Sequence, residues 1–369
     1  MSFRDDVAEF LWTVRRPDGL TDYGPTPGPE HVAAGREWQA ILAEHGYACL
    51  HWPAEHGGRD ASVAEQAAFA EECARAGVPR QLSIVGPDLV GPVLMRFGTA
   101  GQNANFLPRI RTGADLWCQL FSEPGSGSDL ASVSTKARQD GTGWIVDGQK
   151  VWTSGAEDAD YGLLLARTGG PGRAGLSVFS VPMSAPGILV RPLRQMDGES
   201  KFNEVFFEGV RLDPACLIGE VGGGWQVATA TLGRERLSLG ANAVGMFKAL
   251  AELESTAEEH NLLDATLSED ITKLWLRVWL LRTTWERAID EGAEPGGASF
   301  SVLKLLTSET YRDIGDLGVS ALGLAALEED QPLVKRMLVG HAQTILGGTS
   351  EIQRNILAER VLGLPRGPK

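Results

Sequence analysis

Residues 118–130, CQLFSEPGSGSDL, pass from a short apolar run into a loop rich in glycine and serine. Glu123-Pro124 ends the apolar run, and Gly125 and Gly127 free the backbone that follows. Such a loop can present backbone N–H groups and hydroxyls to a flat polar ligand or a phosphate. It is not a dinucleotide fingerprint, because no third glycine follows and no βαβ unit surrounds it. Taken alone, a Gly/Ser stretch of this kind is more often a loop that binds nothing.

The sequence pattern of residues 115–214, which contain this loop, predicts short strands separated by turns. In GWIVDGQKVW (143–152), the Asp147-Gly148 dipeptide between alternating residues predicts a hairpin turn. Trp152 and Ser154 then share one face of the second strand, although a strand tryptophan taken alone is more often a core residue than a ligand platform. Further short β-type runs are bounded by glycine or proline: YGLLLART (161–168), GLSVFSVP (175–182) and EVFFEGVRL (204–212).

Helical patterns flank this β-region on both sides. VAEQAAFAEECARAG (63–77) predicts a helix that ends at Gly77, and residues 222–260 predict a long helix after a glycine hinge. EDITKLWLRVWLLRTTWERAID (269–290) predicts another, capped by Ser268. Its inward stripe is expected to be Ile271, Leu274, Trp275, Val278, Trp279, Arg282 and Trp285. The order predicts an α+β chain with domains at 1–114, 115–214 and 215–369.

Bulk properties exclude several classes of function. The 369 residues carry a net charge of −14 without a basic cluster, which argues against nucleic acid and anionic membrane surfaces. No apolar run reaches the roughly 20 residues that span a bilayer, and the acidic start does not resemble a signal peptide. The four cysteines lie far apart, so we expect reduced thiols in a cytoplasmic protein. His51 and His56 lack a third ligand at useful spacing, so no metal site is predicted.

Five segments, in order, resemble the acyl-CoA dehydrogenase family. They are GYACLHWPAEHGG (46–58), FSEPGSGSD (121–129), GQKVWTSGAEDAD (148–160), LGRERLSLGANAVG (232–245) and ILGGTSEIQRNILAERVLG (345–363). The resemblance implies an N-terminal helical bundle, a middle β-barrel domain and a C-terminal four-helix bundle. It also implies non-covalent FAD, α,β-desaturation of an acyl-CoA thioester and transfer of electrons to an electron-transferring flavoprotein.

The resemblance also assigns binding residues one by one. Those expected to contact FAD are Gln119, Phe121, Ser122, Gly127 and Ser128 in the first segment, Trp152, Thr153 and Ser154 in the next, and Thr349, Ser350 and Glu351 in the last. Ser122 is expected to bond the flavin ring. Substrate contacts are expected from Ser128, Arg236 and Gly348.

The reaction needs a base that removes the α-proton while a hydride goes from Cβ to flavin N5. Many members of the family carry a glutamate directly before the Gly-Thr of the final turn, where this chain has Gly347. A minority place it on the first C-terminal helix, where LGRERL supplies Glu235. An apolar 3–4 stripe predicts that Glu235 points inward, where burial raises a carboxyl pKa; the stripe is Trp225, Ala228, Thr229, Leu232, Leu239, Ala243, Met246, Phe247 and Leu250. The alternative is a buried acid paired with Arg234 or another arginine.

Two segments depart from the family's pattern for reaching across a dimer interface to the partner's FAD. Residues 260–271 contain no Arg, Phe or Gly, and in residues 319–327 Ser320 and Leu324 replace the usual Gln and second Gly. We therefore expect an α2β2 assembly with a paralogous acyl-CoA dehydrogenase subunit. The alternative is a homotetramer in which Lys273 or Arg277 replaces the lost arginine. Other readings left open are a silent subunit, nitroalkane oxidation and dehydrogenation of a carrier-protein thioester. A bulky, branched or steroid-type acyl group is expected.

Overall fold

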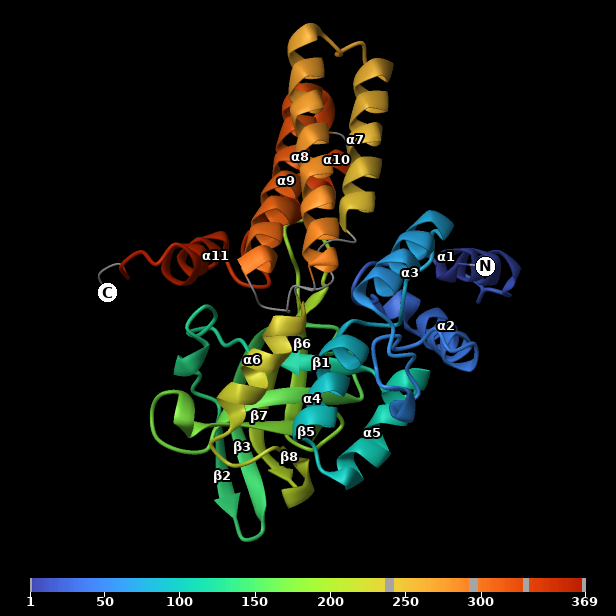
Figure 1. Cartoon of the computed structure of the whole chain (residues 1–369). Helices are drawn as coiled ribbons and strands as arrows, with labels where there is room; N and C mark the ends of the chain where they lie inside the picture. Colours follow the sequence, from blue (N-terminus) through green and yellow to red (C-terminus); the bar gives the residue numbers. More distant parts are fainter. Residues whose placement is uncertain (1, 236–241, 292–297, 328–331, 367–369) are drawn as a thin grey trace. The chain divides into compact units, whose positions relative to one another are not determined.

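The computed structural model describes residues 2–235, 242–291, 298–327 and 332–366. The chain divides into two compact units, Met1–Leu232 and Gly233–Lys369, which are described separately (Figure 1). The first unit combines an N-terminal group of helices with one β-sheet, and the second is helical. The predicted α+β architecture, with helices before and after the β-region, is confirmed.

Helices dominate the first part of unit 1. They are α1 (Phe3–Thr13), α2 (Val32–Glu44), α3 (Val63–Ala76), α4 (Gly91–Phe97) and α5 (Ala100–Thr112). Ser62 and Glu65 form a capping box at the start of α3. Gly77 ends α3 in the left-handed conformation, as the sequence predicts.

Between residues 117 and 218, all of which the structure describes, eight strands form one sheet. The strands are β1 (Trp117–Leu120), β2 (Lys136–Asp140), β3 (Gly143–Ser154), β4 (Tyr161–Arg167), β5 (Leu176–Pro182), β6 (Ile188–Leu193), β7 (Phe202–Leu212) and β8 (Leu217–Ile218). Their order is β6-β7-β3-β2-β4-β5-β8, with β1 paired to β4. The pairs β1–β4 and β2–β4 are parallel and the others are antiparallel.

The hairpin predicted at Asp147-Gly148 is wrong in its position. The turn lies between Asp140 and Gly143, which face each other at the ends of β2 and β3. Asp147 and Gly148 lie inside β3, where the register against β7 shifts. Gly148 has φ +153°, and a Cβ there would come within 2.6 Å of Thr135 Oγ1. The glycine therefore serves a close approach within the sheet rather than a turn.

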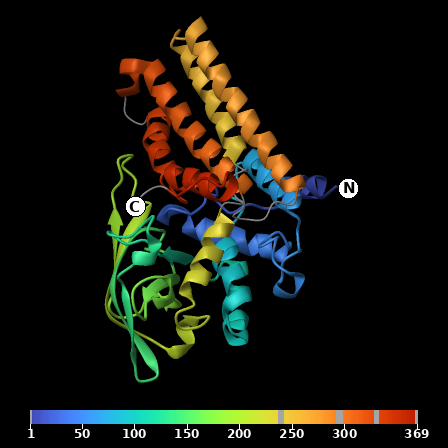
Figure 2. The ribbon, with the colours of Figure 1, turned by 60° about the vertical axis from the view of Figure 1, so that its left-hand side comes forward.

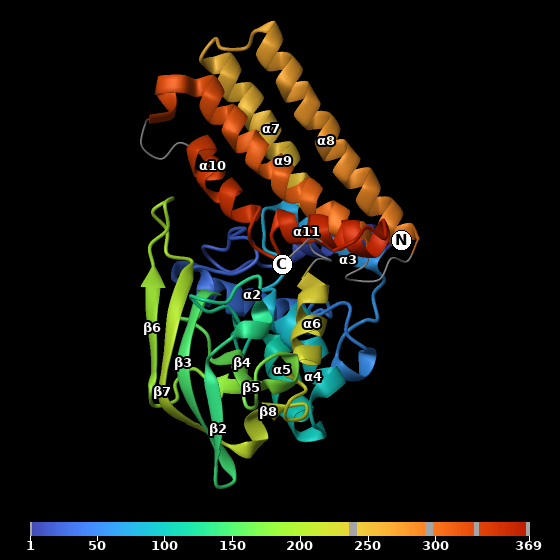
Figure 3. The same ribbon diagram turned by 90° about the vertical axis from the view of Figure 1, so that its left-hand side faces the viewer.

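The core of unit 1 joins the helices to the sheet. Helices α4, α5 and α6 (Gly224–Glu235) lie along one side of the sheet (Figure 3). Val227 and Ala228 of α6 are buried in a cluster with residues of α1–α5 and the strands. Thr229, which the sequence placed on the inward stripe, is instead exposed, and Thr231 is buried.

Unit 2 is built from long helices. They are α7 (Asn242–Glu259), α8 (Ala265–Asp290), α9 (Ala298–Leu322) and α10 (Pro332–Gln343), which run side by side (Figure 2). The short helix α11 (Ser350–Ile356) lies across one end of this bundle (Figure 3). Residues 222–260, expected as one helix, comprise α6 and α7 in the described part of the chain, and residues 236–241 between them lie outside it.

Helix α8 corrects two expectations. Its cap is Asp264, whose carboxylate accepts a hydrogen bond from Leu267 N at 2.8 Å, so the prediction of Ser268 as the cap was wrong. Leu281 is buried, whereas Trp279 is 51% exposed and Arg282 is half-buried. The remaining members of the expected stripe are buried or half-buried.

Several features bear on the excluded classes of function. The four cysteines are all free, and three of them are buried. None of the described helices has the length and apolar character needed to cross a bilayer. The described residues contain no cluster of three His, Cys, Asp or Glu side chains suited to a metal ion.

Candidate functional site

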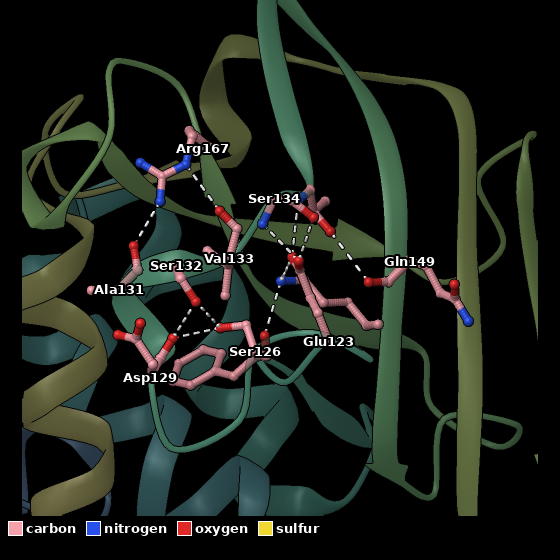
Figure 4. A network of polar contacts seen from close by, with 12 residues as sticks. Glu123, Ser126, Asp129, Ala131, Ser132, Val133, Ser134, Gln149 and Arg167 are labelled. Atoms are coloured by element: carbon pink, nitrogen blue, oxygen red, sulfur yellow. Dashed lines mark hydrogen bonds and ion pairs between the residues drawn. The ribbon is translucent and has the colours of Figure 1, made fainter. Parts of the chain in front are cut away.

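The Gly/Ser loop after β1 is a tight turn followed by open backbone. Glu123 and Ser126 exchange backbone hydrogen bonds of 2.9 and 3.0 Å, and the Ser126 hydroxyl donates to Asp129 O at 2.6 Å (Figure 4). At Gly125 and Gly127, a Cβ would have no heavy atom of the described chain within 4 Å, apart from those of the glycine itself and its two chain neighbours. Hydrogen bonds therefore fix the turn from Glu123 to Ser126, while the backbone at Gly125 and Gly127 is left uncovered.

Trp152 lies in a bulge of β3 beside this loop. Lys150 faces Val205 and Thr153 faces Asn203, so β3 has one more residue than β7 across this interval. Trp152 adopts φ +59°, a conformation that a bulky L residue rarely takes. Its side chain is 58% exposed, while Val151 and Thr153 on either side are buried. Tertiary structure therefore directs this tryptophan toward solvent instead of the core.

The loop and the strand are tied together by hydrogen bonds. Val151 N donates to Ser122 O at 2.9 Å, and Lys150 Nζ donates to Phe121 O at 2.9 Å and to Glu123 Oε1 at 2.8 Å. Burial alone would raise the pKa of Glu123, but the charge and hydrogen bond of Lys150, with donors from Ser134 and Thr135, lower it to about 2. Burial lowers the pKa of Lys150 to about 8, against the opposing effect of Glu123.

The structure brings most of the expected flavin residues of unit 1 into this one region. Gln119 is half-buried on β1, Ser122 is half-buried, and Ser128 is exposed on the loop. The Phe121 ring is buried in the core, and its backbone carbonyl accepts a hydrogen bond from Lys150 Nζ. Thr153 has a buried hydroxyl without a partner in the described chain, and Ser154 closes β3 half-buried.

Sequence reasoning missed Glu123 and Lys150 as members of this site. The available signal was Lys150 itself, a lysine within the β-type run two residues before Trp152. Phe202 was also missed; its ring, on β7, lies edge-on to that of Trp152. Asn203 beside it accepts a hydrogen bond from Ala156 N at 3.0 Å, which anchors the chain after the bulge.

The expected C-terminal segment has its own defined geometry within unit 2. Gly347 and Gly348 adopt φ +64° and +92°, both left-handed. Thr349 caps α11 by accepting from Ile352 N at 3.2 Å, and Glu351, whose pKa is lowered by backbone and Thr349 hydrogen bonds, is exposed. Ser350 is 4% exposed, and its hydroxyl has no partner among the described residues. The glycines thus give the turn its shape and leave one buried hydroxyl unpaired.

The expected base lies at the edge of the described region. Glu235 is the last residue of α6, and its side chain lies outside the described part. Arg236, expected near the substrate, also lies outside the described residues. The assignment of Glu235 as the base stays a prediction from the sequence.

A shallow cavity of about 600 Å³ adjoins the loop. Asp129, Ala131 and Ser132 form one part of its lining and residues 169–172 another, and Arg167 also lines it. The Arg167 guanidinium donates to four backbone carbonyls, those of Ala131, Val133, Gly170 and Gly172. Arg167 therefore fixes the two walls of the cavity.

These features fit an extended flavin cofactor. The exposed ring of Trp152 offers an aromatic face, and the open backbone around Gly125 and Gly127 offers close approach to a planar ring or a pyrophosphate. The buried hydroxyl of Thr153, which has no partner among the described residues, is a polar group that a bound ligand could satisfy.

Comparison with known proteins supports the same family throughout. Models of the acyl-CoA dehydrogenase N-terminal, middle and C-terminal domains match residues 3–114, 118–210 and 222–362. Acyl-CoA dehydrogenase IpdE1 of Mycobacterium tuberculosis (strain ATCC 25618 / H37Rv) is 42% identical over 353 residues, which are 93% of this chain and 92% of that protein.

Solved structures agree with the sequence relatives. The Tcur3481-Tcur3483 steroid ACAD has a TM-score of 0.85 at 29% identity, covering 99% of this chain and 97% of that one. The ChsE4-ChsE5 complex from Mycobacterium tuberculosis has a TM-score of 0.83 at 29% identity, with the same coverage. Members of the family that matches here are FAD flavoproteins. The three domain models in order, together with close relatives over most of the length, place this chain in the acyl-CoA dehydrogenase family.

Proposed function

We propose that the chain catalyses α,β-dehydrogenation of an acyl-CoA thioester, with FAD bound at the loop and bulge described above. The observation that carries the proposal is Trp152, which is exposed and left-handed beside the open Gly/Ser loop. A residue in such a conformation costs about 1–3 kcal/mol and persists only where the surrounding structure imposes it. A binding platform accounts for both the strain and the exposure.

The chain's own residues have distinct tasks in this reaction. When bound, FAD supplies the acceptor for the hydride that leaves Cβ. Trp152 would pack beside the flavin ring. Ser122, Thr153 and the backbone of the open loop would hold the cofactor by hydrogen bonds. Glu235 takes the α-proton, so that C–H bonds break at both carbons and a C=C bond forms. Gly347 has no side chain to compete for that role.

The cavity beside the loop is proposed to receive part of the CoA moiety. It borders Asp129, directly after Ser128, and its walls carry the exposed glycine-rich segment 169–172. A backbone-rich wall of this kind suits a polar chain with amide and phosphate groups. Ser128 then contributes to both cofactor and substrate.

The acyl group is proposed to be bulky, of the steroid type. A relative of known structure is described as a steroid ACAD, at 29% identity over nearly the whole chain. In this chain, Gly347 leaves space where other members of the family carry a glutamate, as the resemblance implies. Electrons are proposed to leave through an electron-transferring flavoprotein.

The active assembly is proposed to be an α2β2 heteromer with a paralogous subunit. ChsE4-ChsE5 is a complex of two unlike chains, and this chain lacks the arginine and glutamine expected to reach a partner's FAD. The two suggested replacements are already engaged: Lys273 lies 2.9 Å from Glu269 and Asp270, and Arg277 pairs with Asp313. The homotetramer alternative would have to break those pairs.

Turnover on a panel of CoA esters tests the proposal. The chain, alone and with its paralogous partner, would be assayed with an artificial electron acceptor on butyryl, branched and steroid-type thioesters. We expect a flavin absorption spectrum and turnover that is fastest with the steroid-type ester. A preparation that cannot be reconstituted with FAD in either form, or one that prefers butyryl-CoA, would contradict the proposal or its substrate class respectively.

A further inference from the structure

A carboxylate and an ammonium group lie buried together beneath the Gly/Ser loop. The side chain of Lys150 is fully buried and that of Glu123 is 4% exposed, with Nζ and Oε1 2.8 Å apart. Lys150 reaches this position from β3, and Glu123 from the first turn of the loop. The pair is thus shielded from solvent on both sides.

The Glu123 carboxylate is satisfied by four donors. Besides Lys150 Nζ, it accepts from Ser134 N at 2.6 Å, Ser134 Oγ at 2.8 Å and Thr135 N at 2.9 Å (Figure 4). Ser134 and Thr135 directly precede β2. A single carboxylate therefore joins three segments that are separate in sequence: the loop, the entry to β2 and β3.

The pair lies between the elements that the proposed function needs. Ser122 precedes Glu123 and the open glycines follow it, while Lys150 occupies the last regular position of β3 before the bulge. The bond from Val151 N to Ser122 O runs alongside. Any displacement of Lys150 would be transmitted directly to Trp152 two residues later.

Stability alone does not account for such a pair. Removing two charges from water costs about as much as their attraction returns, and apolar residues of similar volume often replace a buried pair without loss of stability. The five hydrogen bonds of these two side chains, one of which is also the ion pair, impose a fixed geometry. That geometry explains the residue types at positions 123 and 150 better than stability does.

We infer that Glu123 and Lys150 are positioning residues that hold the loop 122–128 and Trp152 in one arrangement toward the flavin. The inference rests on the proposed function for the identity of the ligand. Without the anchor at Lys150, β3 can slip toward regular pairing with β7, which relieves the left-handed conformation of Trp152 and turns its ring away.

The test replaces the pair as a unit in the full chain, with its partner subunit where one is needed. The variant is Glu123→Leu with Lys150→Met, which removes both charges and keeps similar volume. The matched control is Arg109→Met with Asp115→Leu, because Asp115 is also buried and paired but lies away from the loop. Each protein would be examined by thermal melting, amide hydrogen exchange without FAD, FAD titration and the visible spectrum of the bound flavin.

We expect the pair variant to melt near the wild type, with at least tenfold faster exchange in residues 121–135 and 149–156. Its Kd for FAD should rise at least tenfold, and the flavin bands should shift. The control should leave both segments and the FAD affinity unchanged. Unchanged exchange in those segments, or an unchanged Kd and spectrum, would overturn the inference.

Two further measurements keep the outcome decisive. If the Leu/Met variant does not fold, Glu123→Gln with Lys150→Met retains an acceptor for the amides of Ser134 and Thr135, and the same criteria apply. If the wild type does not bind FAD, the proposed function fails by itself. Amide hydrogen exchange in the FAD-free protein then still decides whether Glu123 and Lys150 order residues 121–135 and 149–156. Faster exchange confined to these two segments in the variant supports that role.

Discussion

The indole ring of Trp152 lies edge-on to the ring of Phe202, with centroids 6.0 Å apart and planes at 85°. Phe202 opens β7, the strand against which the bulge of β3 forms. An edge-to-face pair of this kind contributes about 0.5–1.5 kcal/mol, comparable with the strain of the left-handed backbone at Trp152. The exposed ring therefore has a defined orientation, which can be tested through its backbone.

Replacing Trp152 by glycine should give a more stable protein than replacing it by alanine. Both variants lose the contact with Phe202, so their difference reports the backbone conformation. A left-handed alanine costs about 1–2 kcal/mol, which reverses the usual advantage of alanine over glycine in a strand. Urea unfolding of the two FAD-free variants measures the difference. If the alanine variant proves the more stable, the bulge conformation is not imposed by the fold.

Glu235→Gln should lower turnover by roughly three or more decades while leaving the flavin bound. Loss of a general base lowers the rate by about two to four decades, and the amide cannot accept the α-proton. Steady-state rates with an artificial acceptor measure the effect, and the flavin spectrum serves as the control for folding. Adding Gly347→Glu to this variant should restore part of the rate. A single variant with near wild-type turnover would place the base elsewhere.

Lowering the pH should reduce the free energy of unfolding, because Glu123 has a lowered pKa in the folded chain. Its pKa is about 2 in the folded chain against an ordinary value of 4.5, so below pH 4.5 the unfolded chain binds a proton that the folded chain does not. This contribution, at most about 3 kcal/mol, is present above pH 4.5 and is lost as pH falls toward 2. Urea unfolding from pH 6 to pH 2.5 should show a smaller pH dependence for Glu123→Gln than for wild type. The exposed Glu208→Gln is the control, and identical slopes in all three proteins would refute the assignment.

Expressed alone, the chain should hold FAD weakly, and with its paralogous partner it should form an α2β2 assembly with one FAD per unlike pair. Each charged hydrogen bond lost to a phosphate costs about 1.5–3 kcal/mol. Losing two of these bonds lowers affinity by about two decades or more. Native mass spectrometry and flavin content measure the stoichiometry. An active homotetramer with one tightly bound FAD per chain would contradict this expectation.

The sequence was sufficient for the order of helices and strands, the end of α3 at Gly77 and the Gly/Ser loop, and for the family to which the chain belongs. These features depend on periodicity and turn chemistry within a few residues, which the folded chain does not override. The sequence could not decide whether Asp147-Gly148 forms a hairpin turn or lies inside a strand, because a turn and a strand bulge both favour glycine. The pairing of β3 with β7 and the close approach of Thr135 decide between them.

Some residues of the candidate site could likewise be predicted from the sequence, whereas others were found only in the tertiary structure. Ser122, Ser128 and Trp152 could be named from motifs, since each motif is contiguous. The role of Lys150 could not, because its carboxylate partner lies 27 residues away and a lysine in a strand is usually solvated. Likewise, only packing in unit 2 could bury Leu281 and leave Trp279 exposed on α8. Local sequence thus specified the elements and the chemistry they carry, whereas contacts distant in sequence decided which side chains are buried, paired and strained.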